Sequence, residues 1–236
     1  MGKITIMPYT NKYPMSLMGE AAGYCWGSDT SDREKNVARA IDCIEHGHGR
    51  VSEFGDVYIT IEGYSARVMR ELYTHIGGAP TRLQESTRYV KYEGFDYVKP
   101  HNMTKDQEDL YCWAMEDTMS SYRALIDAGM SKEDAANILP LGMMSKMVLR
   151  INARTLIEMS HQRECSRAYW EFRELFRDLK IALKEYSEEW ATLVDNYFMP
   201  KCEFFGYCNE RKPCKKKFQK IREEMKAKQE AEKNED

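Results

Sequence analysis

Two short runs of β-branched and aromatic residues stand in a chain that otherwise repeats its apolar residues at helical spacing. Val57–Ile61 (VYITI) and Met147–Ile151 (MVLRI) have the composition of β-strands. A helical pattern follows each run, over about 65–75 and about 152–163. The alternation of Ile4 and Ile6 with polar neighbours predicts one more short strand. The sequence therefore predicts a single helix-rich α+β domain with a mostly antiparallel sheet.

Other signals place the long helices. Capping-box patterns, in which a Ser or Thr and a Glu or Gln three residues later satisfy unpaired amides, begin at Ser31 and at Thr104. The second of these helices should end at Gly129, and a third apolar stripe runs over 168–197. The segment Gly77-Gly78-Ala79-Pro80 should end the 65–75 helix, because glycine and proline are poor helix residues. We expect a loop after it, over 81–85.

Composition excludes several classes of protein. Hydrophobic residues make up 42% of the 236 residues, which is enough for a real core. No apolar run approaches the ~18 residues that cross a bilayer, and MGKITIMPYT at the N-terminus lacks the features of a signal peptide. We therefore expect a cytoplasmic protein with no membrane contact. The net charge of −3 argues against a protein that coats nucleic acid.

The C-terminal part differs in composition, so we expect a catalytic region over 1–200 and a cysteine-containing, charged tail over 201–236. Cys202, Cys208 and Cys214 are evenly spaced there. Three thiolates with one more ligand could hold zinc, but the paired Cys-x-x-Cys knuckles of zinc ribbons are absent and ordinary thiols are favoured. His46 and His48 have no evident third ligand nearby. We expect no metal.

Two polar clusters could carry chemistry, although glycine-rich phosphate loops and Gly-x-Ser-x-Gly elbows are absent. The first, over 81–89, contains Arg82, Ser86, Thr87 and Arg88, and such hydroxyls and guanidinium groups suit a phosphate. A polar surface loop with ion pairs explains it equally well. The second cluster surrounds a strand-to-helix junction, where anions are favoured; intrachain ion pairs are the alternative there. Its members are Asn152, Arg154, Glu158, Arg163 and Arg167.

The order and spacing of these segments resemble the flavin-dependent thymidylate synthases. The similarity covers residues from about Glu34 to Glu174. It depends on the following pieces together: His46-Gly47-His48 with Glu53, VYITI, His75, Gln84-x-Ser86-Thr87-Arg88-Tyr89, Leu139-Pro140-Leu141, Asn152-Ala153-Arg154, and Arg163 with Ala168-x-Trp170-Glu171.

The resemblance implies a homotetramer with flavin adenine dinucleotide (FAD) at subunit interfaces. It implies that methylenetetrahydrofolate supplies a carbon to C5 of dUMP and that NADPH is the reductant. Arg163 matches the family arginine that stabilises the activated uracil. Gln84, Ser86, Thr87 and Arg88 match the family's nucleotide-binding block. The full set of substrate-binding residues that we expect adds Arg70, Glu71, Arg82 and Glu85. The flavin-binding residues are His48, Glu53, His75, Asn152, Arg154 and Glu158.

The chain departs from the family at charged positions. The family signature Arg-His-Arg is Thr74-His75-Ile76 here, and a phosphate-binding arginine of the family is replaced by Ala136. Either Arg70 and Arg82 restore the lost charges, or the site has turned to another uracil nucleotide. A decayed homologue that only binds flavin or nucleotide is a third interpretation. The first is favoured.

Overall fold

The computed structural model describes residues 2–77 and 80–233, with side chains as far as residue 224. The chain forms two compact units, each built from two segments. Unit 1 comprises Met1–Thr10 and Asp56–Ile151, and unit 2 comprises Asn11–Gly55 and Asn152–Asp236. This division was not predicted from the sequence. The functional division at residue 200 stays a prediction, and Gly78 and Ala79 of the expected helix-ending segment lie outside the described residues.

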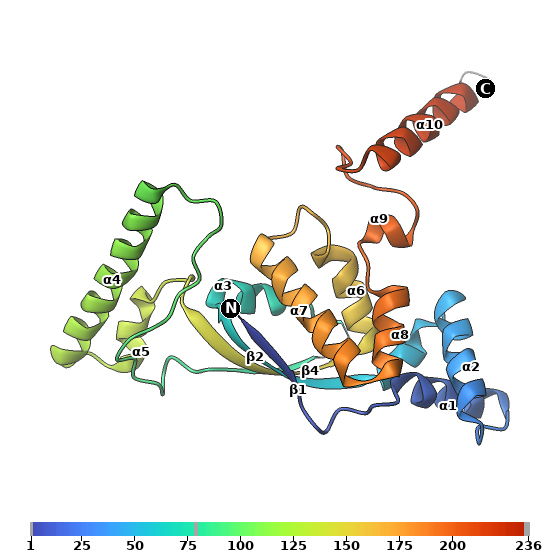
Figure 1. The fold of residues 1–236 in the computed structure, drawn as a ribbon, viewed down its shortest axis with the longest axis horizontal. Helices are drawn as coiled ribbons and strands as arrows, with labels where there is room; N and C mark the ends of the chain where they lie inside the picture. The colour runs from blue at the N-terminus through green and yellow to red at the C-terminus, as the bar shows by residue number, and fades with distance from the viewer. Residues whose placement is uncertain (1, 78–79, 234–236) are drawn as a thin grey trace. The chain divides into compact units, whose positions relative to one another are not determined.

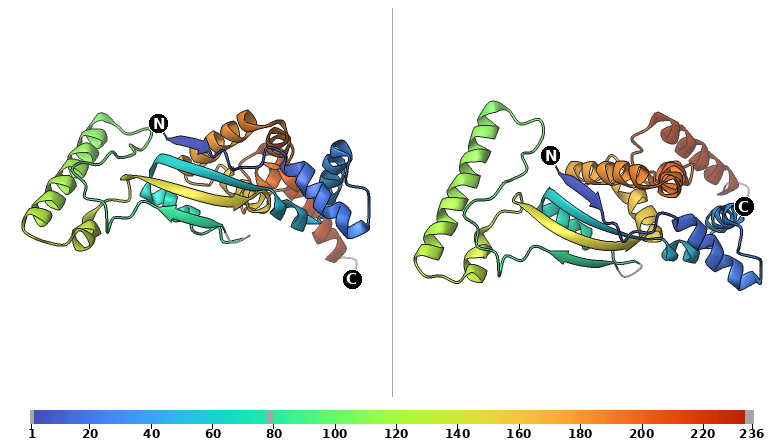
Figure 2. Two further views of the ribbon diagram at one scale, coloured as in Figure 1. Left: turned by 90° about the horizontal axis from the view of Figure 1, so that it is seen from below. Right: turned by 60° about the horizontal axis from the view of Figure 1, so that its bottom comes forward.

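Unit 1 is built on a four-stranded sheet with the order β1-β2-β4-β3 (Figures 1 and 2). Its strands are β1 (Lys3–Ile6), β2 (Asp56–Ser65), β3 (Thr81–Gln84) and β4 (Met144–Asn152). β1 pairs with β2, and β3 with β4, in antiparallel register. The prediction of an α+β, helix-rich fold with a mostly antiparallel sheet is confirmed.

Alternation along the strands explains which face of the sheet is buried. Val57, Ile59 and Ile61 of β2 are all fully buried, and their neighbours in sequence are more exposed. The same period of two recurs in β4, where Leu149 is 2% and Val148 is 41% exposed. Side chains of a strand point alternately to opposite faces, so one face of each strand contributes to the core.

The helices of unit 1 follow their capping signals. α3 (Ala66–Leu72) begins after Ser65, whose hydroxyl accepts a hydrogen bond from the Val68 amide. α4 (Lys105–Asp127) begins with the predicted capping box of Thr104 and Gln107. α5 (Lys132–Ala135) and the short 3₁₀ helix η2 (Ala136–Ile138) follow. A cluster of buried apolar side chains joins this helical part to the loop before it; it contains Tyr92, Met119, Tyr122, Ala135 and Met143.

Unit 2 is helical. In chain order it contains α1 (Pro14–Trp26), α2 (Arg33–Glu45), η1 (Gly49–Phe54), α6 (Ala153–Arg163), α7 (Trp170–Tyr186), α8 (Glu188–Tyr197), α9 (Lys201–Phe204) and α10 (Lys216–Lys233). α1 and α2 pack closely because Gly19 has no side chain. A Cβ atom added there would lie 1.7 Å from the Asn36 carbonyl oxygen, far inside van der Waals contact.

Several local predictions were wrong. Thr81–Gln84 is a strand, not a loop, because it pairs with β4 over Thr81↔Arg150 to Gln84↔Met147. The cap of α2 is Asp32, whose carboxylate accepts from the Lys35 amide, and not Ser31.

The helix boundaries also differ. The helix predicted over 65–75 ends at Leu72. The single stripe over 168–197 is two helices, because Ser187 leaves helical geometry and caps α8 through the Trp190 amide. Within the described residues no helix has both the length and the apolarity that a membrane span requires.

Candidate functional site

The predicted nucleotide-binding segment is an edge strand that runs into a turn. In unit 1, the Gln84 side chain donates to the Ser145 hydroxyl (3.2 Å) and the Glu85 amide donates to the Lys146 carbonyl (2.9 Å). The turn closes on Ser86, whose hydroxyl accepts from the Arg88 amide (3.3 Å). Ser86 and Thr87 are half-buried. The strand therefore fixes where these predicted substrate-binding groups lie.

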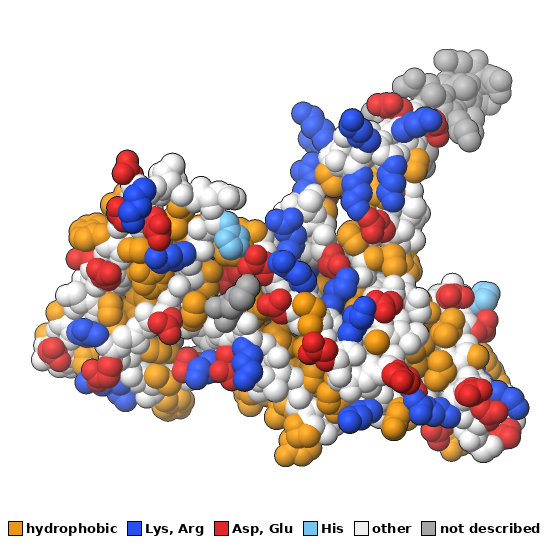
Figure 3. Space-filling model, viewed as in Figure 1, with side chains coloured by type: hydrophobic (Ala, Val, Ile, Leu, Met, Phe, Trp, Pro, Cys, Tyr) orange, Lys and Arg blue, Asp and Glu red, His pale blue; other side chains and the backbone are white. Residues whose placement is uncertain are grey.

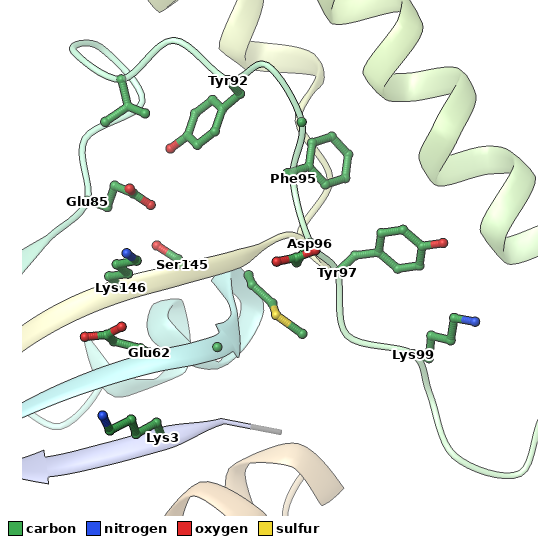
Figure 4. Close-up of a pocket in the computed structure, with 14 residues that line it drawn as sticks. Lys3, Glu62, Glu85, Tyr92, Phe95, Asp96, Tyr97, Lys99, Ser145 and Lys146 are labelled. Carbon is green, nitrogen blue, oxygen red and sulfur yellow. The ribbon is translucent and has the colours of Figure 1, made fainter.

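A cavity of about 850 Å³ borders this segment (Figure 4). Lys146, Glu62 and Lys3 lie on the strands β4, β2 and β1, and Glu85 directly follows β3. Tyr92 and Phe95 come from the loop that faces them. Glu85 is the only one of the sequence-predicted site residues among its described lining. The other lining residues were not predicted, because no local sequence pattern marks residues that meet across three strands and a loop.

Tyr92 gives this cavity a buried hydroxyl. Burial raises the pKa of Tyr92 to about 12, so the hydroxyl keeps its proton at neutral pH. The hydroxyl has no hydrogen-bond partner within the described part of the chain. Because a buried polar group without a partner is costly, this hydroxyl suits a hydrogen bond with a bound molecule or an ordered water.

Arg82 is close to the position where the family signature has its charges. Its guanidinium donates to the His75 carbonyl and lies over the Tyr73 ring, 5.1 Å from the centroid. Burial lowers the pKa of Arg82, but a guanidinium stays charged at neutral pH. The structure thus places the Arg82 cation beside buried His75.

The other charged residues of this part are less enclosed. Arg70 is exposed, and Glu71 is half-buried with one carboxylate oxygen 3.9 Å from Arg67 Nε. Arg88 pairs with Glu133 at 3.0 Å, and both side chains are more than half exposed. In this arrangement Arg88 therefore belongs to a surface ion pair.

In unit 2, η1 and α6 bring together charged residues that are far apart in the sequence. Arg154 donates from Nη1 to Glu53 (2.6 Å) and from Nε to Glu158 (3.3 Å). The hydrogen bond to Glu53 contributes most to raising the pKa of Arg154. The Arg154 side chain is 43% exposed, so the two carboxylates orient its guanidinium without enclosing it.

Two more predicted flavin-binding residues flank this cluster. Asn152 is buried, and its Oδ1 accepts from the Thr155 amide and hydroxyl, both at 2.9 Å. It therefore has a structural role as the cap of α6. His48 is exposed and precedes η1. Since a Cβ atom at Gly49 would lie 3.7 Å from Arg154 Nε, the start of η1 is beside the Arg154 guanidinium.

Arg163 is the last residue of α6 and is half-buried. Its guanidinium carbon lies 4.4 Å from the centroid of the Phe172 ring. It lines a cavity of about 470 Å³ between the α6–α7 connection and the segment 200–214. A guanidinium held over a ring and facing a cavity can stabilise negative charge on a ligand. The contribution of segment 200–214 to this cavity was not predicted.

The thiols of Cys202, Cys208 and Cys214 line the same cavity, and Cys165 joins them from the α6–α7 connection. Burial raises the pKa of the Cys202 thiol, which favours its protonated form. Across the described residues, no group of three or more His, Cys, Asp or Glu side chains is arranged to hold a metal ion. The cysteines are free thiols in this arrangement.

The fold places the chain among the helix-rich α+β proteins with a four-stranded sheet. The family model described as "thymidylate synthase complementing protein" matches residues 5–187. The chain belongs to this family, the flavin-dependent thymidylate synthases.

Curated relatives and a solved structure agree with this assignment. The chain is 28% identical to the flavin-dependent thymidylate synthase of Pyrococcus furiosus, over 94% of this chain and 99% of the relative. It is 34% identical to that of Geobacter sulfurreducens, over 73% of this chain and 78% of the relative. A crystal structure of thymidylate synthase X from Helicobacter pylori with FAD and dUMP has a similar fold, with a TM-score of 0.68 and 19% identity. The structural similarity covers 83% of this chain and 99% of the Helicobacter pylori chain.

Proposed function

We propose that this chain is an FAD-dependent thymidylate synthase that methylates dUMP reductively at C5 to give dTMP. The proposal takes methylenetetrahydrofolate as carbon donor and NADPH as reductant. The observation that supports it most directly is Arg163, the residue that matches the family's uracil-activating arginine, held over Phe172 and facing a cavity.

Arg163 would act by electrostatics. C5 of uracil becomes nucleophilic when negative charge develops on the ring, and a fixed cation stabilises that charge more in the transition state than in the ground state. A guanidinium cannot transfer its proton at neutral pH. The guanidinium lies over the Phe172 ring, and this cation–π contact favours the observed orientation.

The Arg154 cluster fits a dinucleotide. Its guanidinium suits a pyrophosphate oxygen, and Glu53 and Glu158 can accept hydrogen bonds from ribose hydroxyls or from ring N–H groups. We assign FAD binding to Arg154, Glu53, Glu158, His48, Asn152 and His75. FAD, when bound and reduced, supplies the electrons of the reductive step.

The substrate-binding assignment rests on the edge strand and its turn. Gln84, Glu85, Ser86, Thr87 and Arg88 would contact dUMP, and Arg70, Glu71 and Arg82 would replace the charges that the signature lacks. We also propose a homotetramer, because the family resemblance puts the flavin at subunit interfaces, and a cytoplasmic location with no nucleic-acid partner.

An anaerobic turnover experiment tests the function. Purified protein loaded with FAD is reduced with NADPH and then given methylenetetrahydrofolate and dUMP. We expect the flavin to reoxidise and dTMP to appear in equal amount. The matched controls omit either methylenetetrahydrofolate or dUMP. In both controls the flavin should stay reduced and no dTMP should form. Flavin that stays reduced in the presence of both would refute dUMP methylation.

A second substrate is the alternative, and one observation favours it. Thr74 and Ile76 replace two cations of the signature, and charge-assisted hydrogen bonds are worth about 1.5–3 kcal/mol each. If dUMP is inert while the flavin is bound and reducible, the same experiment is repeated with UMP and with modified uracil nucleotides. A protein that binds flavin but turns over none of them is a decayed homologue.

Replacing Arg154 should release the flavin. Arg154→Met keeps most of the side-chain length but leaves Glu53 and Glu158 without their cation. We expect FAD to bind about 10- to 100-fold more weakly, the loss of one charge-assisted contact. The measurement is a titration of the apoprotein followed by visible flavin absorption. The control is Arg177→Met, whose arginine is 63% exposed on α7 beside Glu174. Wild-type affinity in Arg154→Met would remove Arg154 from the flavin site.

A further inference from the structure

The segment 201–222 carries a concentration of positive charge that the proposed reaction does not use. It contains eight Lys or Arg residues and two Glu residues, although the whole chain has a net charge of −3. Figure 3 shows Lys and Arg side chains gathered over the region that Figure 1 labels α9 and α10. Concentrated charge of one sign attracts ligands of the opposite sign.

Both acidic residues of this segment are already paired. Glu203 is in contact with the Lys215 ammonium, and Glu210 lies 3.6 Å from Arg167 Nε. Lys201, Arg211, Lys212 and Arg222 form no ion pair with any described residue. The positive charge is therefore not neutralised within the described part of the chain.

These cations line two neighbouring cavities. The first is the cavity of about 470 Å³ that contains Arg163, and Lys201 and Arg167 line it too. The second, of about 330 Å³, is lined by Arg211, Lys212 and Arg222, with Pro213, Gln219 and Glu223.

A short stretch of chain connects the two. Glu210 lines the first cavity, and the next two residues, Arg211 and Lys212, line the second. Arg167 Nη2 donates to the Lys212 carbonyl (2.9 Å), and Gln219 donates to the Pro213 carbonyl (2.7 Å). Hydrogen bonds thus hold the backbone between the two cavities.

Arg222 provides a second, independent indication of a ligand. Its Nη1 atom is buried and has no hydrogen-bond partner among the described residues. A buried guanidinium N–H without an acceptor is costly. A carboxylate in the second cavity would supply that acceptor.

We infer that the two cavities form one anion-binding track, which starts at Arg163 and holds the oligo-γ-glutamyl tail of the folate co-substrate. The inference rests on the proposed function, since Arg163 marks the reaction site and the carbon donor must lie beside it. A chain of carboxylates extending from that donor meets first Arg167 and Lys201, and then Lys212 and Arg222.

The surface chemistry favours this ligand over a nucleic acid. Single-stranded nucleic acids bind to open aromatic platforms beside cations. The aromatic rings of this segment are half-exposed, but they contact one another and His161 edge-on or tilted, which is not the row of open ring faces that stacked bases need. Phe204 lies 4.5 Å from the His161 ring and 4.9 Å from Phe205, and Phe205 lies 6.2 Å from Tyr207, as centroid distances.

The test uses two probes on the full chain. Fluorescein-labelled penta-γ-glutamate measures binding directly by anisotropy, and methylenetetrahydrofolate with one or five glutamates measures the effect on KM. We expect the five-glutamate form to have a KM about tenfold lower, the size expected of a few half-exposed ion pairs. The double variant Lys212→Gln/Arg222→Gln should lose this difference and the peptide binding, and leave the KM of the one-glutamate form unchanged.

The control is Arg177→Gln/Lys184→Gln, which removes two positive charges from α7 and should leave the difference in KM intact. Equal KM values for both folates in an active wild-type enzyme would overturn the inference and leave the proposed function standing. A double variant that keeps both the difference in KM and the peptide binding would also overturn the inference. So would an RNA oligonucleotide that displaces the labelled peptide, if the number of glutamates has no effect on KM. If no dTMP forms but the peptide binds and needs Lys212 and Arg222, the track stands and the proposed function falls.

Discussion

Replacing Arg163 with methionine should lower kcat about 100- to 1000-fold, the effect of removing one preorganised group that stabilises developing charge. Methionine preserves much of the packing against Phe172 but carries no charge. FAD affinity should stay at the wild-type value, because Arg163 is not in the Arg154 cluster. The measurements are steady-state kcat and KM for dUMP, together with a flavin titration.

Arg163→Lys separates charge from geometry. Lysine keeps a positive charge, but it is a compact ammonium and not a planar fork that can stack on a ring. We expect its kcat to fall between those of the wild type and Arg163→Met. Arg177→Met provides the control for loss of an arginine from the same unit. A kcat within about threefold of wild type in Arg163→Met would mean a structural role only, since one preorganised donor is worth far more.

Local periodicity was sufficient to predict the elements whose partners lie nearby in the sequence. The alternation in β2 and the capping box of Thr104 are both signals within a few residues. β3 could not be found in this way. It is an edge strand of only four residues, three of them polar (TRLQ), and its pairing with β4 is what defines it.

The same distinction applies to the site. Glu53 was selected through the family resemblance, and Arg154 was selected also from its place at a strand-to-helix junction. Their contact spans 101 positions, and spacing within one segment cannot show it. Residues 200–214 line one side of the Arg163 cavity, and all of them except residue 200 were predicted to belong to a tail. Cys165 joins three C-terminal cysteines for the same reason. Such arrangements depend on how the helices pack, and therefore on the whole core.

The largest loss of folding stability is expected from a substitution in the core of unit 2. Trp190 of α8 is fully buried, and its indole N–H donates to the Asn11 carbonyl (2.9 Å). Trp190→Ala removes a large apolar group and leaves that carbonyl without its donor. We expect the apparent free energy of unfolding to fall by about 3–5 kcal/mol. Urea unfolding followed by circular dichroism at one protein concentration provides the measurement.

Trp26→Ala provides the matched control, because Trp26 is 56% exposed at the end of α1 and surface substitutions change stability by about 0.5 kcal/mol or less. Trp190→Phe keeps an aromatic ring but loses the hydrogen bond, so its destabilisation should lie between the other two. If Trp190→Ala and Trp26→Ala shift the unfolding midpoint equally, α8 does not anchor unit 2. The Arg163 cavity would then be expected to survive the loss of Trp190. If only Trp190→Ala shifts the unfolding midpoint, α8 anchors unit 2. Because α7 and the segment 200–214 lie on either side of α8 in the sequence, we then expect dUMP turnover to fall together with the folded fraction as urea is added.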